Sequence, residues 1–269
     1  MSGGAFSARG TLSKDDRAEL AALARVIEDL DPSGPPRIIL VLRASQGISG
    51  PGQRLGVFSA SFNPLTRAHV RMMEQAMEEH ALAEVMLVLD KVNVDKREVF
   101  GASLAERLWM LRRFATGRPR LSVAASSHGR FVDKTKALRM IYPEGTELTF
   151  IVGFDTLVRV FDPKYYADPE AELEGLFRHS QFIVANRGEV SMSEVRRWLK
   201  SPVCRPFVDR IHLMELDPFH ARISATEVRA RIDRGQPFAE LVPPEIAPLI
   251  PKTGLTSSPP ESSTVPPDP

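Results

Sequence analysis

Apolar residues follow two kinds of pattern along this chain, and the two kinds alternate. Short continuous apolar runs are typical of strands that are covered on both faces of a parallel sheet. Between most of these runs, apolar residues recur every three or four positions, which predicts amphipathic helices. The expected strands are 38–42, 55–60, 85–89, 121–124, 148–152, 182–185 and 211–214, and the expected helices include 15–30, 103–116, 134–141, 170–178, 192–200 and 224–234. This order predicts an α/β fold with a doubly wound parallel sheet, in which ligands bind beyond the carboxyl ends of the strands.

The two ends of the chain differ from its middle. Residues 1–50 predict an N-terminal extension with one helix and one strand, and residues 51–250 contain the alternating pattern. Residues 251–269 are rich in Ser, Thr and Pro, a composition that predicts a disordered tail. We therefore expect one large domain with an extension at each end.

Composition limits the classes of function. The chain has 269 residues, with 35 Lys plus Arg against 34 Asp plus Glu, so nothing in its charge favours a nucleic acid or a membrane surface as a partner. No apolar run approaches the roughly 20 residues of a membrane span, and no secretory signal is expected. The single cysteine, Cys204, excludes an intramolecular disulfide and suits a reducing compartment, so we expect a cytoplasmic or nuclear location. The oligomeric state stays open.

The segment from Ser61 to His69 lies between an expected strand and an expected helix. A strand that enters a helix through a tight turn brings free backbone N–H groups to the positive end of the helix dipole, where phosphate binds well. Thr66 and His69 lie three positions apart in the first helical turn, so their side chains project toward the same point. This pattern predicts phosphate chemistry, although Thr66 alone also fits an N-cap and His69 a half-buried helix residue.

A second helix start near the end of the chain has a similar character. Ser224 and Glu227 fit a capping box, which is a sufficient structural explanation for those two residues. It does not explain Thr226 and Arg229, which place a hydroxyl and a guanidinium near the same helix start. A second anion site is therefore predicted. Two such helix starts in one sheet support a phosphate-binding function better than either one alone.

Together these segments resemble the nucleotidyltransferases with a Thr/His-x-x-His signature, and most closely the nicotinamide/nicotinate mononucleotide adenylyltransferases. The segment from Ala60 to His69 is similar to Gly-Ser-Phe-Asn-Pro-Ile-Thr-x-x-His, and that from Ile223 to Arg229 to Ile-Ser-Ser-Thr-x-x-Arg. Gly153-Phe154-Asp155 resembles the Gly-x-Asp of the family, and Arg187 follows the next strand, as an arginine does there. The resemblance runs from about residue 55 to about residue 249 and implies a Rossmann-like nucleotidyltransferase fold for residues 51–250.

The resemblance implies that the protein binds ATP and a mononucleotide and joins them. It implies that His69, Lys96 and Arg229 are catalytic, with His69 on the α-phosphate and Arg229 on the β- and γ-phosphates. Other nucleotide contacts are implied for the backbone of Ser61 and Phe62, and for Thr66, Gly153, Asp155, Arg187, Ile223, Ser224 and Thr226. Lys96 also fits a solvated lysine and Asp155 an N-cap. Mg²⁺ is expected to bind through the ATP phosphates and not through a protein metal site, since no His/Asp/Glu cluster has metal-ligand spacing.

The chain departs from the family pattern at several positions. Ala60 replaces a glycine and Ala225 a serine, and no tryptophan stands near Thr135, where many members hold the pyridine ring. Tyr165 and Tyr166 fall where the family has Leu-Trp, so a tyrosine ring is a candidate for stacking on the base, although the pair also fits ordinary packing.

Three hypotheses follow from this sequence. In the first, the enzyme joins nicotinamide mononucleotide (NMN) to the AMP part of ATP. In the second, the acceptor is a nicotinate nucleotide, phosphopantetheine or another phosphate-bearing compound. In the third, the protein binds nucleotide without catalysis and has a regulatory role.

Overall fold

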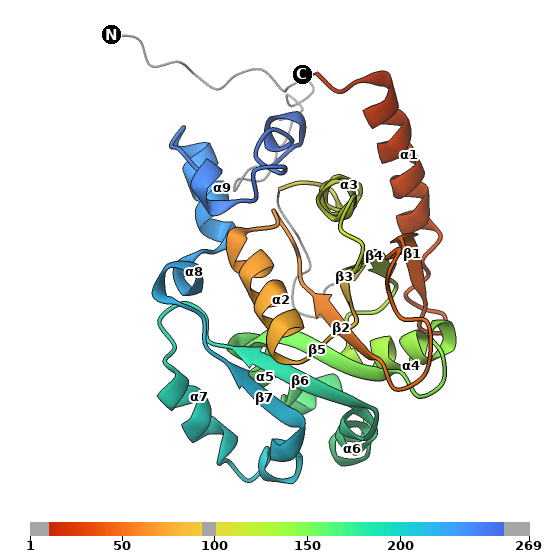
Figure 1. Ribbon diagram of the computed structural model, residues 1–269, viewed down its shortest axis with the longest axis vertical. Helices are drawn as coiled ribbons and strands as arrows, with labels where there is room; N and C mark the ends of the chain where they lie inside the picture. The colour runs from red at the N-terminus through yellow and green to blue at the C-terminus, as the bar shows by residue number, and fades with distance from the viewer. Residues whose placement is uncertain (1–10, 93–100, 256–269) are drawn as a thin grey trace, which may run out of the picture.

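Each expected strand is present in one seven-stranded sheet of the computed structural model, which describes residues 11–92 and 101–255 (Figure 1). The sheet is built from β1 (Ile38–Leu42), β2 (Arg54–Ser59), β3 (Glu84–Asp90), β4 (Leu121–Ser126), β5 (Glu147–Gly153), β6 (Ser180–Ala185) and β7 (Ile211–Met214). The α-helices are α1 (Lys14–Glu28), α2 (Arg67–Glu79), α3 (Leu104–Ala115), α4 (Phe131–Ile141), α5 (Phe154–Val160), α6 (Pro169–His179), α7 (Met192–Leu199), α8 (Pro218–Arg222) and α9 (Ala225–Asp233). Short 3₁₀ turns complete the described chain at Pro163–Tyr165, Arg205–Arg210, Ala239–Leu241 and Ile250–Lys252.

The strand order is β1-β4-β3-β2-β5-β6-β7, and strands β2 to β7 are parallel. The expected doubly wound α/β fold is thus confirmed, but the expectation of a fully parallel sheet is wrong for β1, which pairs antiparallel with β4. A continuous apolar run carries no information on strand direction. No helix follows β1 before β2, so no crossover constrains its direction, and β1 docks at the sheet edge.

Helices cover both faces of the sheet and form two cores. One core joins the sheet to α1, α2, α3, α8 and α9 and includes Trp109 and Phe114. The other joins it to α4, α5, α6 and α7 and includes Phe150 and Phe182. Coverage on both faces explains why the strands are continuously apolar rather than alternating.

The N-terminal extension packs against the main domain. Helix α1 lies beside α3, where Arg113 contacts Asp16 at 3.1 Å and Glu19 at 2.6 Å. Order also continues past residue 250, because Leu255 is buried and the Gly254 N–H donates to Glu106 at 3.1 Å. Residues 251–255 therefore belong to the packed structure, whereas the rest of the predicted tail lies outside the described residues.

The chain reverses its direction across the sheet between β2 and β5. After β2 it adds β3 and β4 on one side, and then it crosses to add β5, β6 and β7 on the other. In open parallel sheets a crevice forms at this reversal, outside the carboxyl ends of the strands. The loops that follow β2 and β5 are therefore the place where this fold would bind a ligand.

Candidate active site

A cleft of about 790 Å³ opens at the carboxyl ends of the strands. Each of β2 to β7 contributes lining residues at or after its end, so segments far apart in sequence meet there. The lining residues are Ser59, Ala60, Ser61, His69, Asp90, Gly129, Arg130, Phe131, Phe154, Asp155, Thr156, Val158, Arg159, Val160, Tyr165, Tyr166, Arg187, Gly188, Val190, Ser224, Ala225 and Thr226. Its size suits a nucleotide-sized ligand.

His69 is held at the cleft by its own helix start. Thr66 is the N-cap of α2, and both its backbone N–H and its hydroxyl lie near His69 Nδ1, at 3.0 Å and 2.9 Å. Because a backbone N–H can only donate, Nδ1 is an acceptor, and the proton of the neutral imidazole lies on Nε2. Burial, and then the positive charge of Arg187, lower the pKa of His69 well below its ordinary value. The site therefore contains a neutral imidazole that donates through Nε2.

Thr66 does not line the cleft. Its side chain is fully buried and is used in capping α2 and in contacting His69. The structure thus gives Thr66 a positioning role, in agreement with the N-cap alternative, and does not place it where a phosphate would contact it directly.

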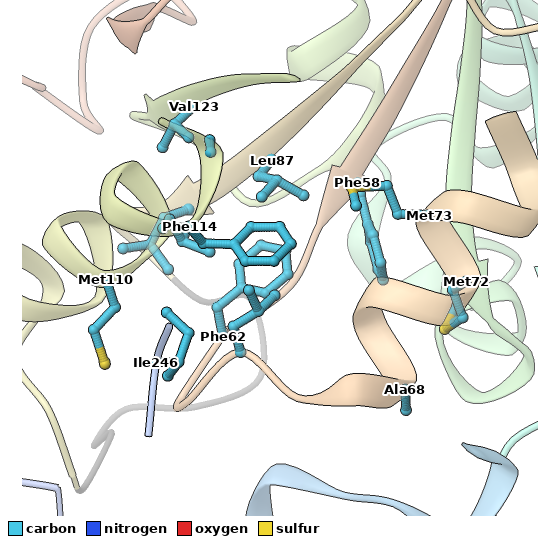
Figure 2. Packing of buried hydrophobic residues seen from close by; sticks show 14 of the residues in the cluster. Phe58, Phe62, Ala68, Met72, Met73, Leu87, Met110, Phe114, Val123 and Ile246 are labelled. Carbon is cyan, nitrogen blue, oxygen red and sulfur yellow. The ribbon is translucent and has the colours of Figure 1, made fainter. Parts of the chain in front are cut away.

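Phe62 anchors the turn between β2 and α2. Its φ of 40° lies in the left-handed region, a conformation that costs a bulky residue about 1–3 kcal/mol. The side chain is 1% exposed and points into the core that contains Phe114 and Leu87 (Figure 2). Burial of a phenylalanine contributes roughly 1.5–3 kcal/mol, enough to offset the strain. The Phe62 side chain is thus structural, and only the backbone of the turn lies near the cleft, where Ser61 lines it.

The second helix start converges on the same turn. The Arg229 guanidinium of α9 donates from Nη1 to the Asn63 carbonyl at 2.5 Å and from Nη2 to Thr226 Oγ1 at 3.3 Å. Ser224 caps α9 by accepting from the Glu227 N–H at 3.1 Å. The predicted capping box is only half formed, because the Glu227 carboxylate pairs with Arg231. The structure therefore unites two predicted anion sites that lie far apart in the sequence.

The loop after β5 brings Gly153, Asp155 and Arg187 together. A Cβ at Gly153 would lie 2.7 Å from Asp155 Oδ1 and 3.0 Å from Arg187 Cδ, so glycine permits this packing. Gly153 is itself the N-cap of α5, which excludes the alternative that Asp155 is the cap; Asp155 instead pairs with Arg159 at 3.1 Å. Arg187 donates to the carbonyl of buried Ile223 at 3.5 Å, and burial lowers the pKa of Arg187.

The other half of the cleft is aromatic. Tyr165 and Tyr166 both line it, and the Tyr166 hydroxyl donates to the Val160 carbonyl at 2.5 Å; their stacking on a base stays a prediction. The sequence missed Phe131, which lines the cleft from the first turn of α4 and packs on Phe150 with ring centroids 4.9 Å apart. Its only local signal was an aromatic residue at the start of the helix that follows β4.

Thr135 lies one turn further along α4 than Phe131. It is buried, 4% exposed, and it is not among the residues that line the cleft. The position of Thr135 on α4 turns its side chain into the protein interior, and a contact between Thr135 and a substrate stays a prediction.

An ion pair between a buried lysine and a partly exposed aspartate lies beneath this aromatic half, and the sequence analysis did not single it out. Lys134 Nζ contacts Asp90 Oδ2 at 3.0 Å, and the Lys134 side chain is 0% exposed. Ser59 also donates to Asp90 Oδ2, at 2.9 Å. Burial raises the pKa of Asp90, while Lys134 and Ser59 act in the opposite direction. At the floor of the cleft, the positive charge of Lys134 therefore balances the negative charge of Asp90.

Two predictions concern residues or groups that the structure does not show. Lys96 lies outside the described residues, so its role stays a prediction. Within residues 11–92 and 101–255, no three His, Cys, Asp or Glu side chains are grouped to hold a metal, and no helix is long and apolar enough to cross a membrane. The two carboxylates that line the cleft, Asp90 and Asp155, already pair with Lys134 and Arg159. Any Mg²⁺ would therefore depend mainly on phosphate oxygens.

Comparison with known proteins finds a nucleotidyltransferase family model and relatives named as adenylyltransferases. A family model described as cytidylyltransferase-like matches residues 57–231. A probable nicotinate-nucleotide adenylyltransferase of Desulfitobacterium hafniense is 28% identical over 213 residues, which cover 77% of this chain and 98% of the relative. A putative nicotinamide mononucleotide adenylyltransferase of Schizosaccharomyces pombe is 33% identical over 136 residues, covering 49% and 52%.

A solved structure shares the fold. The Plasmodium falciparum nicotinic acid mononucleotide adenylyltransferase complexed with NaAD superposes with a TM-score of 0.55 at 16% identity. The aligned region covers 72% of this chain and 93% of that one.

Proposed function

The chain belongs to the cytidylyltransferase-like family and is a nucleotidyltransferase, and from that premise we propose that it transfers AMP from ATP to a pyridine mononucleotide. The observation that carries this proposal is the meeting of two helix starts at one turn, with His69 on α2 and Arg229 on α9. Both bring backbone N–H groups and a side-chain donor to the same place, as a triphosphate requires.

The reaction is an in-line displacement at phosphorus. A phosphate oxygen of the acceptor attacks the α-phosphorus of ATP, a new O–P bond forms, and the bond to the bridging oxygen breaks as pyrophosphate leaves. His69 Nε2–H donates to an α-phosphate oxygen, whose charge grows in the transition state. Arg229 and the start of α9 hold the β- and γ-phosphates. The acceptor phosphate is already ionised, so no base is needed.

Magnesium, when bound to the phosphates, neutralises part of their charge. The residues of this chain supply the rest of the positive potential. We assign the adenosine part of ATP to Gly153 and Asp155, and Arg187 lines the cleft near them. Phe131 and the two tyrosines supply aromatic faces for the pyridine ring of the acceptor.

We propose NMN as the first acceptor to test. We assign the acceptor to the aromatic half of the cleft, where Phe131, Tyr165 and Tyr166 lie. The two cations near these rings already have carboxylate partners among the described residues: Arg130 contacts Asp133 and Glu172, and Lys134 contacts Asp90. A neutral carboxamide therefore fits this half without the need for an unpaired cation. Nicotinate mononucleotide is the second candidate, because relatives named for that substrate align over almost their whole length.

The test is a parallel assay of the purified protein. The protein with ATP and Mg²⁺ is given NMN, nicotinate mononucleotide or phosphopantetheine at equal concentration, and pyrophosphate release and the dinucleotide product are measured. NAD formed from NMN at a higher kcat/KM than the nicotinate product supports the proposal. The reverse order selects the second candidate. Tight ATP binding with no turnover on any acceptor would instead support the regulatory hypothesis.

A further inference from the structure

A charged residue is buried in the apolar core behind the site. Arg107 lies on α3, next to Leu108 and Trp109, and is only 3% exposed. Its Nε donates to the Ala102 carbonyl at 2.7 Å, and no carboxylate among residues 11–92 and 101–255 lies within ion-pair distance. A buried guanidinium without a carboxylate partner is costly, so its charge requires an explanation.

In the part of the chain that the structure describes, the charged group with the largest effect on Arg107 is another cation. Burial, followed by repulsion from Arg229, lowers the pKa of Arg107 to about 10. Glu106 acts in the opposite direction, but its carboxylate accepts from the backbone N–H groups of Ser103 and Gly254. Two guanidinium groups that repel each other in the free protein would be stabilised together by a polyanion.

A continuous set of hydrogen bonds also joins the two arginines. Arg107 holds the carbonyl of Ala102, and the N–H of Ala102 donates to Asn63 Oδ1 at 3.2 Å. The carbonyl of Asn63 in turn accepts from Arg229 at 2.5 Å. Gly101, with φ of 104°, presses against the Asn63 side chain, since a Cβ there would lie 2.7 Å from both amide heteroatoms. Asn63 is thus held by the segment just before α3, and its carbonyl accepts from Arg229 of α9.

We infer that Arg107 is a positioning residue of the triphosphate subsite, which it serves by fixing the Ala102–Asn63 contact to Arg229 and by adding a positive charge that pairs with no carboxylate of residues 11–92 and 101–255. The inference rests on the proposed function, in which this subsite takes the β- and γ-phosphates of ATP. Arg107 does not line the cleft, so it acts through Asn63 and Arg229 and does not touch substrate.

The test compares ligands that differ only in those phosphates. ATP and AMP binding are measured by calorimetry for the wild type, Arg107→Gln, Arg107→Lys and a control, Arg112→Gln. Arg112 lies on the same helix but faces α1, where it pairs with Glu19 at 3.0 Å. Arg107→Gln is expected to weaken ATP binding about tenfold or more, as loss of a charged member of a buried network does, with AMP binding unchanged. Arg112→Gln should bind both ligands as the wild type does.

The lysine variant separates charge from packing. A lysine begins from a lower pKa than arginine, and the same burial beside other positive charge would lower it further. ATP affinity of Arg107→Lys should therefore fall as the pH rises and the lysine loses its proton, at a pH where the wild type shows no such fall. Thermal unfolding of each variant shows whether it is folded. If Arg107→Gln is not folded, Arg107→Lys still tests the inference.

Distinct results overturn distinct statements. If ATP and AMP affinities fall equally, or neither changes, or the lysine variant shows no dependence on pH, Arg107 is only structural and the inference is overturned. If the wild type itself binds AMP and ATP equally weakly, the proposed function fails and the inference fails with it.

Discussion

Replacement of His69 is expected to remove most of the catalytic rate while leaving substrate binding largely intact. In the proposed reaction, Nε2–H donates to the α-phosphate, and its hydrogen bond strengthens as charge develops there. Loss of one such preorganised donor typically costs about 10²–10³ in kcat, or about 2.7–4 kcal/mol. His69→Ala should lower kcat by that factor, measured as pyrophosphate release at saturating ATP and NMN.

His69→Ala also disturbs the structure around the imidazole. The ring packs edge-on against Phe58 and Phe62, with centroids 5.7 Å and 5.3 Å away, and it accepts from the Thr66 N–H. A buried donor left without an acceptor costs about 1–3 kcal/mol, so the alanine variant should also unfold at a lower temperature. Activity must therefore be measured well below that transition.

His69→Gln is the variant that decides the mechanism. The glutamine amide nitrogen is placed about as far along the side chain as Nε2 and donates without titrating, so this variant should recover about tenfold of the activity lost in His69→Ala. Because the pKa of His69 lies well below its ordinary value, any acidic limb above pH 6 should come from the acceptor phosphate and persist in His69→Gln. The donor role is refuted if glutamine is no better than alanine and the acidic limb is lost with the imidazole.

Three further outcomes are expected. Gly153→Ala should raise the KM for ATP about tenfold in steady-state assays, because its Cβ would lie 2.7 Å from Asp155 Oδ1; an unchanged KM would contradict the packing argument. Lys134→Met should lower the free energy of unfolding by about 1–3 kcal/mol in denaturant titrations, since it leaves the Asp90 carboxylate, which is 20% exposed, without its cation, and adding Asp90→Asn should restore much of the loss. His69 is buried neutral, so below pH 6.5 only the unfolded chain takes up its proton and stability falls; the slope of stability against pH should be shallower in His69→Gln, and an equal slope would refute this.

The sequence predicted the helices and strands well because their patterns are local. Continuous apolar runs and helical spacing arise within a few residues, and the structure reproduces the predicted elements to within a few positions. The direction of β1 was not predictable in this way, since antiparallel pairing with β4 depends on a contact between segments about 85 residues apart. The packing of Leu255 likewise depends on a distant surface, which includes α3.

The candidate site was predicted only in part. The helix-start residues His69 and Arg229 were found because their chemistry follows from local spacing, and the structure brings their segments together. Thr135 was placed at the cleft by counting along the chain, which gives no side-chain direction. Arg107 was missed because a single arginine on a predicted amphipathic helix looks like any solvated residue until its burial is known.

By itself, the sequence determined the α/β class, the alternation of strands and helices, and two helix starts suited to anions, because backbone geometry and side-chain period are properties of short segments. The tertiary structure alone decided that these two starts share one turn, that Nδ1 of His69 is an acceptor, and that the Arg107 guanidinium is buried against the Ala102 carbonyl. Those features depend on distances between segments and on the exclusion of water, and both arise only when the sheet and its helices have assembled.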